Sequence, residues 1–251
     1  MMGSAALNRR RSDIPDFIQT NVNIDSLAED IFSRYAGEQE VVVDGSPYTN
    51  TYFLREYCPD FRVMKLAGEL ALCVNRHAAQ HRSDDALSSL RITVQDIMLA
   101  ALLHDLGKQH EDCAPFIDLL KNKNLRSDEQ KLLEIVRDVH CRKGPCMIDR
   151  LKDAGRTELS NPFVSTVARR HGEDYQTNRS GTKGCWWARE INVITIADDY
   201  DAMVSEGPER AYKPDSLTPT DAVALLRAGV ERGRYEPRIT DIFIADVLGL
   251  S

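Results

Sequence analysis

The sequence contains no apolar run that approaches the ~20 residues a helix needs to cross a bilayer. Its N-terminus, Met1 to Asp13, also lacks the apolar centre of a signal peptide. These absences predict a cytoplasmic protein without a membrane span, in which the six cysteines are reduced thiols rather than a disulfide framework. Cys141 and Cys146 bracket a predicted Gly-Pro turn, and we interpret them as separate thiols in preference to a metal-binding pair.

Basic residues are too few for a protein whose whole surface attracts nucleic acid. Lys and Arg number 32 against 39 Asp and Glu, which gives a net charge of -7. A nucleic-acid-binding surface needs an excess of positive charge, so we expect no stable nucleic-acid complex. A local basic pocket for a small phosphorylated substrate is compatible with this charge.

The composition itself is that of an ordinary globular protein, with 42% hydrophobic and 28% charged residues among 251. This length suits one main domain with an additional N-terminal piece. The first part of the chain has weak apolar periodicity and one expected helix, Ile24 to Tyr35. We therefore expect an accessory segment over residues 1–45 and a larger domain over 46–251, divided at the turn signal Asp44 to Pro47.

Beyond Pro59 the sequence pattern is strongly helical. Apolar residues recur at three- and four-residue steps, at Val63, Leu66, Ala67, Leu70, Ala71 and Val74. A second helix with an apolar stripe leads directly into His104-Asp105. The members of this stripe are Val94, Ile97, Met98, Ala101 and Leu102. Since no convincing alternation of period two is present, the predicted fold is all-α.

Helix start signals then repeat along the chain. Ser127 begins a capping box, which opens a helix expected to run to about Val139. Asn161-Pro162 and Thr218-Pro219 each place a cap residue before a proline at the first helical position, where the missing N–H costs nothing. Ile191 to Met203 is predicted as a helix because this segment continues past ten residues without a turn signal.

Two residues of the metal-ligand type, His104 and Asp105, interrupt a helix face that is otherwise expected to be buried. Burying an unpaired carboxylate is costly, so Asp105 needs a cation or several hydrogen-bond donors. Three further candidates, His140, His171 and Asp198, are each expected at or near the end of an apolar helix. Imidazole and carboxylate groups hold Mn, Fe or Zn, and converging helices are a common way to collect them. Taken alone, each of these residues is more often structural than metal-binding.

The order of these motifs resembles that of the HD superfamily, and within it the HD-GYP phosphodiesterases that hydrolyse cyclic dinucleotides. The string Ala101 to Lys108 is similar to the family's Leu-Leu-His-Asp-Ile-Gly-Lys. His140 with Gly144 is similar to its His-Pro-x-x-Gly element, with Cys in place of Pro. The run Ile196 to Met203 resembles Ala-Asp-x-Tyr-Asp-Ala-Leu, and Arg210 to Lys213 resembles the Arg-Pro-Tyr-Arg that follows it.

This resemblance implies an HD-type helical bundle, a small phosphorylated nucleotide such as cyclic di-GMP as substrate, and two divalent transition metal ions, Mn, Fe or Zn. The implied metal ligands are His104, Asp105, His140, His171 and Asp198. In this scheme Asp105 bridges both ions and takes part in catalysis. Lys108 is the implied catalytic and substrate-binding cation at the phosphate, and Arg210 and Lys213 are expected to bind the substrate's other end. A homodimer is one option for the oligomeric state.

The chain departs from the family pattern at three places. The register of the family's first metal-binding histidine falls on Pro59. His77 and His81, four residues apart, could substitute for it, but they lie on the polar end of the predicted helix, where solvated side chains are expected. The family's double histidine and glutamate are reduced to Arg170-His171-Gly172-Glu173, and the Gly-Tyr-Pro signature is absent from Asp174 to Gly184. Two other functions therefore stay open: an HD-type nucleotide phosphomonoesterase, and a catalytically inactive nucleotide-binding or signalling protein.

Overall fold

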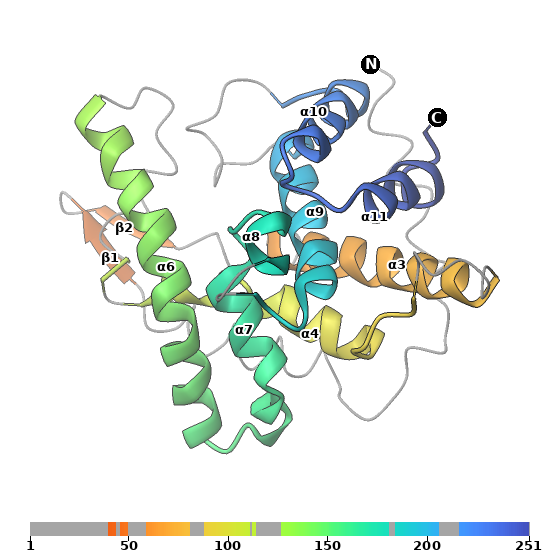
Figure 1. The fold of residues 1–251 in the computed structure, drawn as a ribbon. Coiled ribbons are helices and arrows are strands. Elements are labelled where there is room, and N and C mark those ends of the chain that lie inside the picture. The colour runs from red at the N-terminus through yellow and green to blue at the C-terminus, as the bar shows by residue number, and fades with distance from the viewer. Residues whose placement is uncertain are drawn as a thin grey trace.

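The computed structural model describes residues 40–43, 46–49, 59–80, 88–110, 112–113, 127–180, 184–205 and 216–250. The core of this described part is all-helical, as the sequence predicts (Figure 1). Its α-helices are α3 (Pro59–Gln80), α4 (Val94–Leu103), α6 (Ser127–Asp153), α7 (Pro162–Arg170), α8 (Tyr175–Arg179), α9 (Ala188–Val204), α10 (Pro219–Glu231) and α11 (Pro237–Ile242). Shorter turns of other helical types are η3 (Leu106–Gln109), η5 (Thr157–Ser160) and η7 (Phe243–Val247).

The helix starts agree with the capping signals in the sequence. The Asn161 side chain accepts a hydrogen bond from the Phe163 N–H at 3.0 Å, directly before Pro162 opens α7. The Thr218 hydroxyl accepts one from the Asp221 N–H at 3.2 Å at the start of α10. Each cap satisfies an N–H that has no partner within its helix, so the predicted starts near residues 162 and 219 are confirmed.

Helix α6 is longer than the sequence suggests. It passes the expected end at Val139 and continues through Gly144 and Pro145 to Asp153, so the predicted Gly-Pro turn is wrong. A Cβ atom on Gly144 would lie only 2.9 Å from the Cβ of Ala168 in α7, which shows how closely the two helices approach. This packing offsets the loss of one backbone hydrogen bond, which Pro145 cannot donate because it has no N–H.

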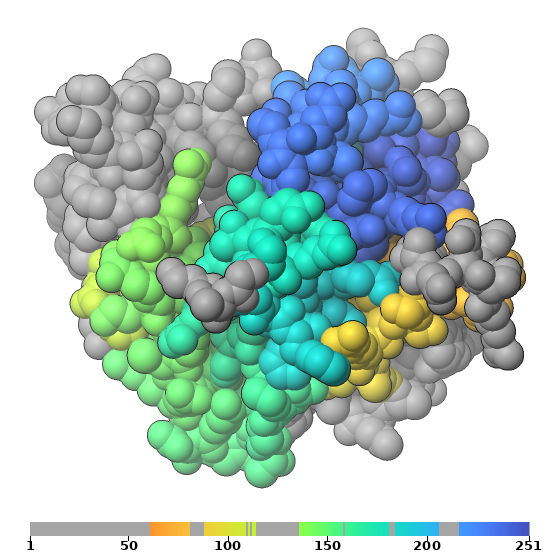
Figure 2. Space-filling view, viewed as in Figure 1, coloured from red at the N-terminus to blue at the C-terminus, as the bar shows by residue number. Residues whose placement is uncertain are grey.

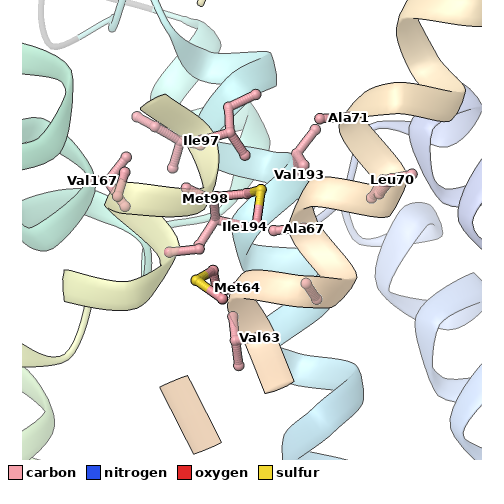
Figure 3. Packing of buried hydrophobic residues seen from close by; sticks show 14 of the residues in the cluster. Val63, Met64, Ala67, Leu70, Ala71, Ile97, Met98, Val167, Val193 and Ile194 are labelled. Carbon is pink, nitrogen blue, oxygen red and sulfur yellow. The ribbon is translucent and has the colours of Figure 1, made fainter. Parts of the chain in front are cut away.

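The hydrophobic core lies where α3, α4, α7 and α9 meet. Figure 3 shows Met64 and Ala67 of α3 facing Met98 of α4 and Ile194 of α9. Helix α6 lies on one side of the molecule and α3 on the other, with α4, α7 and α9 between them (Figure 1). In the space-filling view, α7 and α8 separate α6 from the C-terminal helices on this face (Figure 2). Each predicted ligand therefore lies on or next to a helix that is fixed by this core.

The N-terminal region contributes one structural element to the described residues. Strands β1 (Glu40–Val43) and β2 (Ser46–Thr49) pair in antiparallel register, with Val41 opposite Tyr48, across the division expected at residue 45. The helix expected over Ile24 to Tyr35 lies outside the described residues, as do His81, Arg210 and Lys213. Among the residues described, no helix has the length and apolarity that crossing a membrane requires.

Candidate metal centre

Three buried histidines from three helices turn their rings toward one point. His104 directly follows α4, His171 directly follows α7, and His140 lies in the middle of α6 rather than near its end. The ring centroids of His104 and His171 are 4.9 Å apart, and those of His140 and His171 are 5.2 Å apart. The convergence expected from the sequence is therefore present.

Each of these rings is oriented by a carbonyl group of its own helix. Nδ1 of His104 lies 2.6 Å from the Ala101 oxygen, Nδ1 of His140 lies 2.9 Å from the Val136 oxygen, and Nδ1 of His171 lies 3.1 Å from the Val167 oxygen. A carbonyl oxygen only accepts, so the proton is on Nδ1 in all three rings. In a neutral imidazole this leaves a lone pair on Nε2, which is the atom that faces the other histidines.

The two carboxylate oxygens of Asp105 face different histidines. Oδ1 lies 3.2 Å from Nε2 of His140 and 3.5 Å from Nε2 of His171. Oδ2 lies 3.5 Å from Nε2 of His104, and the same nitrogen is 3.5 Å from Oδ1 of Asp198. Asp105 therefore stands between two groups of donors: His140 and His171 on one side, His104 and Asp198 on the other.

Lys108, which was expected to contact the substrate phosphate, contacts a residue of this cluster instead. Its ammonium group contacts Oδ2 of Asp105 directly, one turn further along the chain. Burial raises the pKa of the Asp105 carboxyl, but Lys108, His104 and hydrogen bonds with the other two histidines outweigh it and hold this pKa well below its ordinary value. Lys108 thus supplies part of the positive charge that the buried Asp105 carboxylate was expected to need.

Three of the remaining predicted ligands, His140, His171 and Asp198, also have shifted pKa values. Burial lowers the pKa of His140 and of His171, yet contact with the Asp105 carboxylate raises both above the ordinary imidazole value. Burial raises the pKa of Asp198, while the neighbouring His104 lowers it by more. The cluster therefore attracts positive charge, either as protons on its imidazoles or as a bound cation.

Only the first carboxylate of the Asp198-Asp199-Tyr200-Asp201 run faces the cluster. Asp199 accepts hydrogen bonds from Arg234 at 2.6 and 2.9 Å. Asp201 is buried and accepts two from Arg62 of α3, at 2.8 and 3.2 Å. These ion pairs fix α9 on either side of Asp198, so its carboxylate is held in place near His104.

Sequence reasoning assigned no function to Cys141, which the structure places at the cluster. Its Sγ lies 3.4 Å from Nε2 of His140 and 4.0 Å from Nε2 of His171. Burial raises the pKa of the thiol, but the two histidines lower it by more, to about 6. Two signals in the sequence pointed to Cys141: its pairing with Cys146 was weighed as a metal pair and not preferred, and it stands where the resembled family has proline.

His77 does not take the place of the family's first histidine. Its Nε2 contacts Oδ2 of Asp246 at 2.6 Å, near the end of α3. Pro59, on which the family register falls, is the first residue of the same helix.

The donor set of the cluster suits a divalent transition metal. Three Nε2 atoms and two carboxylate groups converge, and imidazole nitrogen with carboxylate oxygen is the combination that binds Mn, Fe and Zn in proteins. His104, Asp105 and His171 form one set whose donor atoms lie within 4.8 Å of one another, and His140, Cys141 and His171 form another. The residues present therefore fit metal binding.

Comparison with known protein families supports this interpretation. The HD domain profile matches residues 61–203, which is more than half of the chain and includes all five predicted ligands. Proteins with this domain are generally metal-dependent hydrolases that bind divalent metals. No curated protein matches the chain.

Proposed function

Since this chain belongs to the HD domain family, we propose that it is a metal-dependent phosphodiesterase that hydrolyses a cyclic dinucleotide such as cyclic di-GMP. The observation that carries the proposal is the position of Asp105, whose Oδ1 faces His140 and His171 and whose Oδ2 faces His104. One carboxylate whose two oxygens face different donors suits a two-metal hydrolytic centre.

In the proposed centre, His140 and His171 would hold one ion, His104 and Asp198 would hold the other, and Asp105 would be a ligand of both. When bound, the ions supply a nucleophile from water near neutral pH and offset the charge on the phosphoryl oxygens. The protein residues keep the five donors in position: the Nδ1 contacts fix the rings, and Arg62 and Arg234 fix the helix that bears Asp198.

Lys108 is proposed to bind the substrate phosphate. In the structure its ammonium group neutralises Asp105. A bound cation would take over that role, because it lies on the same carboxylate, and would release the lysine toward a phosphoryl oxygen. Arg210 and Lys213 are proposed as further cations for the other end of the substrate.

The choice of a cyclic dinucleotide is supported by motif order. The segment Ile196 to Met203 lies on α9 with Asp198 facing the cluster, and its sequence resembles that of the HD-GYP phosphodiesterases. The close contact of Lys108 with Asp105 favours one alternative, a nucleotide-binding protein without turnover, because the lysine already neutralises the carboxylate that the ions need.

Elemental analysis followed by product analysis tests the proposal. We expect the purified protein to hold two equivalents of transition metal and to convert cyclic di-GMP into linear products. The same preparation is assayed with other cyclic dinucleotides and with nucleoside monophosphates. Release of inorganic phosphate from monophosphates alone would replace the diesterase by a phosphomonoesterase. Protein that contains metal but hydrolyses nothing would favour the binding protein.

The domain division is proposed on the same basis. We assign residues 46–251 to the HD domain and residues 1–45 to an accessory segment, because the HD profile, residues 61–203, lies wholly within the first of these ranges. A soluble, folded protein that lacks residues 1–45 is expected to keep its full metal content. Loss of metal from such a protein would place the segment within the catalytic domain.

A further inference from the structure

Cys141 lies among donors that the proposed centre already uses. Its Sγ is 3.4 Å from Nε2 of His140 and 4.0 Å from Nε2 of His171, and these two nitrogens are 3.2 Å apart. Oδ1 of Asp105 is 3.2 and 3.5 Å from the same nitrogens. The thiol therefore belongs to the side of Asp105 on which His140 and His171 lie.

These separations are close to those of ligands around one zinc ion. With Zn–N bonds of about 2.0–2.1 Å and Zn–S bonds of about 2.3 Å, tetrahedral geometry places two nitrogens roughly 3.3 Å apart and nitrogen and sulfur roughly 3.6 Å apart. The observed distances are 3.2 Å between the nitrogens, and 3.4 and 4.0 Å from the sulfur to each. Small side-chain movements are enough to complete the set.

We propose that Cys141 is a thiolate ligand of the metal ion held by His140 and His171, and that it makes this position selective for zinc over manganese. The inference rests on the proposed metal centre and adds the identity of one of its ions. Sulfur is a soft donor that favours zinc, whereas manganese favours oxygen and nitrogen.

This assignment makes the two metal positions chemically different. With Asp105, His140, Cys141 and His171, the zinc position would have four protein ligands, the number of a closed site. The position at His104 and Asp198 would have nitrogen and oxygen donors only. The Asp198 side chain is 26% exposed, whereas the side chains of His104, His140 and His171 are 1%, 7% and 5% exposed. Of these four side chains, Asp198 is therefore the one that a substrate can reach.

Cobalt substitution gives a readout that does not depend on activity. Loading the full-length protein with Co²⁺ is expected to produce a thiolate-to-cobalt charge-transfer band in the near ultraviolet, together with visible d–d bands. Cys141→Ser should lose the charge-transfer band and keep visible bands. Cys146→Ser is the matched control, because Cys146 is exposed on the same helix and should leave the whole spectrum unchanged.

Zinc and manganese affinities, measured by chelator competition, test the selectivity. We expect Cys141→Ser to weaken zinc binding by at least about tenfold. A loss of about that size already follows when only the hydrogen-bond partner of a metal ligand is removed. Manganese binding should stay the same within error, so the zinc preference falls by the same factor. Equal loss of both metals would contradict the selectivity and indicate a disturbed fold.

The cobalt spectrum separates failure of this inference from failure of the proposed function. Wild-type protein that binds Co²⁺ without a charge-transfer band retains a metal centre but overturns the role of Cys141. The same conclusion follows if the band persists in Cys141→Ser. If the wild-type protein binds no metal at all, the proposed function fails together with the inference.

Discussion

The backbone of Gly107 lies directly against the carbonyl group of His140. A Cβ atom at position 107 would overlap that oxygen and lie 2.7 Å from the backbone nitrogen of Gly144. Gly107 belongs to η3, which begins directly after Asp105, and both His140 and Gly144 belong to α6. This contact therefore sets the distance between Asp105 and His140, two residues of the proposed centre.

Gly107→Ala is expected to separate η3 from α6 and to weaken metal binding. Because the added methyl meets rigid backbone, overpacking should lower the free energy of unfolding by about 1–3 kcal/mol. Gly172→Ala is the control for stability alone, since its Cβ would meet only the Sγ of Cys141, at an ordinary 3.8 Å, and Cys141 belongs to the proposed centre. Thermal unfolding is measured on both variants, and metal content on Gly107→Ala and the wild-type protein. Unchanged metal content in folded Gly107→Ala would show that this contact does not position the ligands.

Asp105→Asn tests the bridging assignment. The amide keeps the shape of the side chain but removes the charge that offsets two cations, so the centre should bind metal much more weakly or not at all. Asp138→Asn is the control, because Asp138 pairs with Arg142 on an exposed part of α6. Metal content is measured by elemental analysis after dialysis. Full occupancy in Asp105→Asn would end the bridging role.

Helix positions could be predicted because they depend on local patterns, whereas the convergence of the ligands was expected from the resemblance to the HD superfamily. Apolar periodicity located α3 and α4, and cap residues located the starts of α7 and α10. Buried polar residues next to apolar helices then identified His104 and Asp105, since such groups need partners.

The end of α6 and the position of Cys141 depend on tertiary contacts that no local pattern contains. Gly144 and Pro145 ordinarily favour a turn, but packing against Ala168 keeps the segment helical. The side chains of successive helix residues point about 100° apart, so the residue next to His140 is not expected to face the same group of residues as His140. Cys141 does so because His171, at the end of α7, lies beside both side chains.

In the metal-free Cys141→Ser protein, stability is expected to fall as the pH rises above 6.5. The serine variant is used because the lowered pKa of the Cys141 thiol gives the wild-type protein an opposite, rising contribution over the same range. The pKa values of His140 and His171 are raised from 6.5 in the folded state. Their contribution is therefore fully present below 6.5 and is lost as the pH rises through the folded-state values. Thermal unfolding of chelator-treated protein measures this dependence.

Metal should reverse this trend. A metal ion binds the neutral imidazole, so protons compete with it and the increase in melting temperature on adding Co²⁺ should be larger at about pH 8 than at about pH 6. An increment that is independent of pH would argue against His140 and His171 as ligands.

Lys108→Ala separates phosphate binding from metal binding. If Lys108 acts as a single preorganised donor to the transition state, its removal should cost on the order of 2–4 kcal/mol, or roughly 30- to 900-fold in turnover. Metal affinity should stay equal or increase, because the ammonium group that contacts Asp105 competes with a cation for the same carboxylate.

Lys152→Ala serves as the control, since Lys152 pairs with the exposed side chain of Asp149 far along α6. Turnover of cyclic di-GMP and metal content are compared for both variants. Loss of metal from Lys108→Ala would instead identify the lysine as a structural cation that holds Asp105 in place, and the phosphate-binding role would then have to be withdrawn.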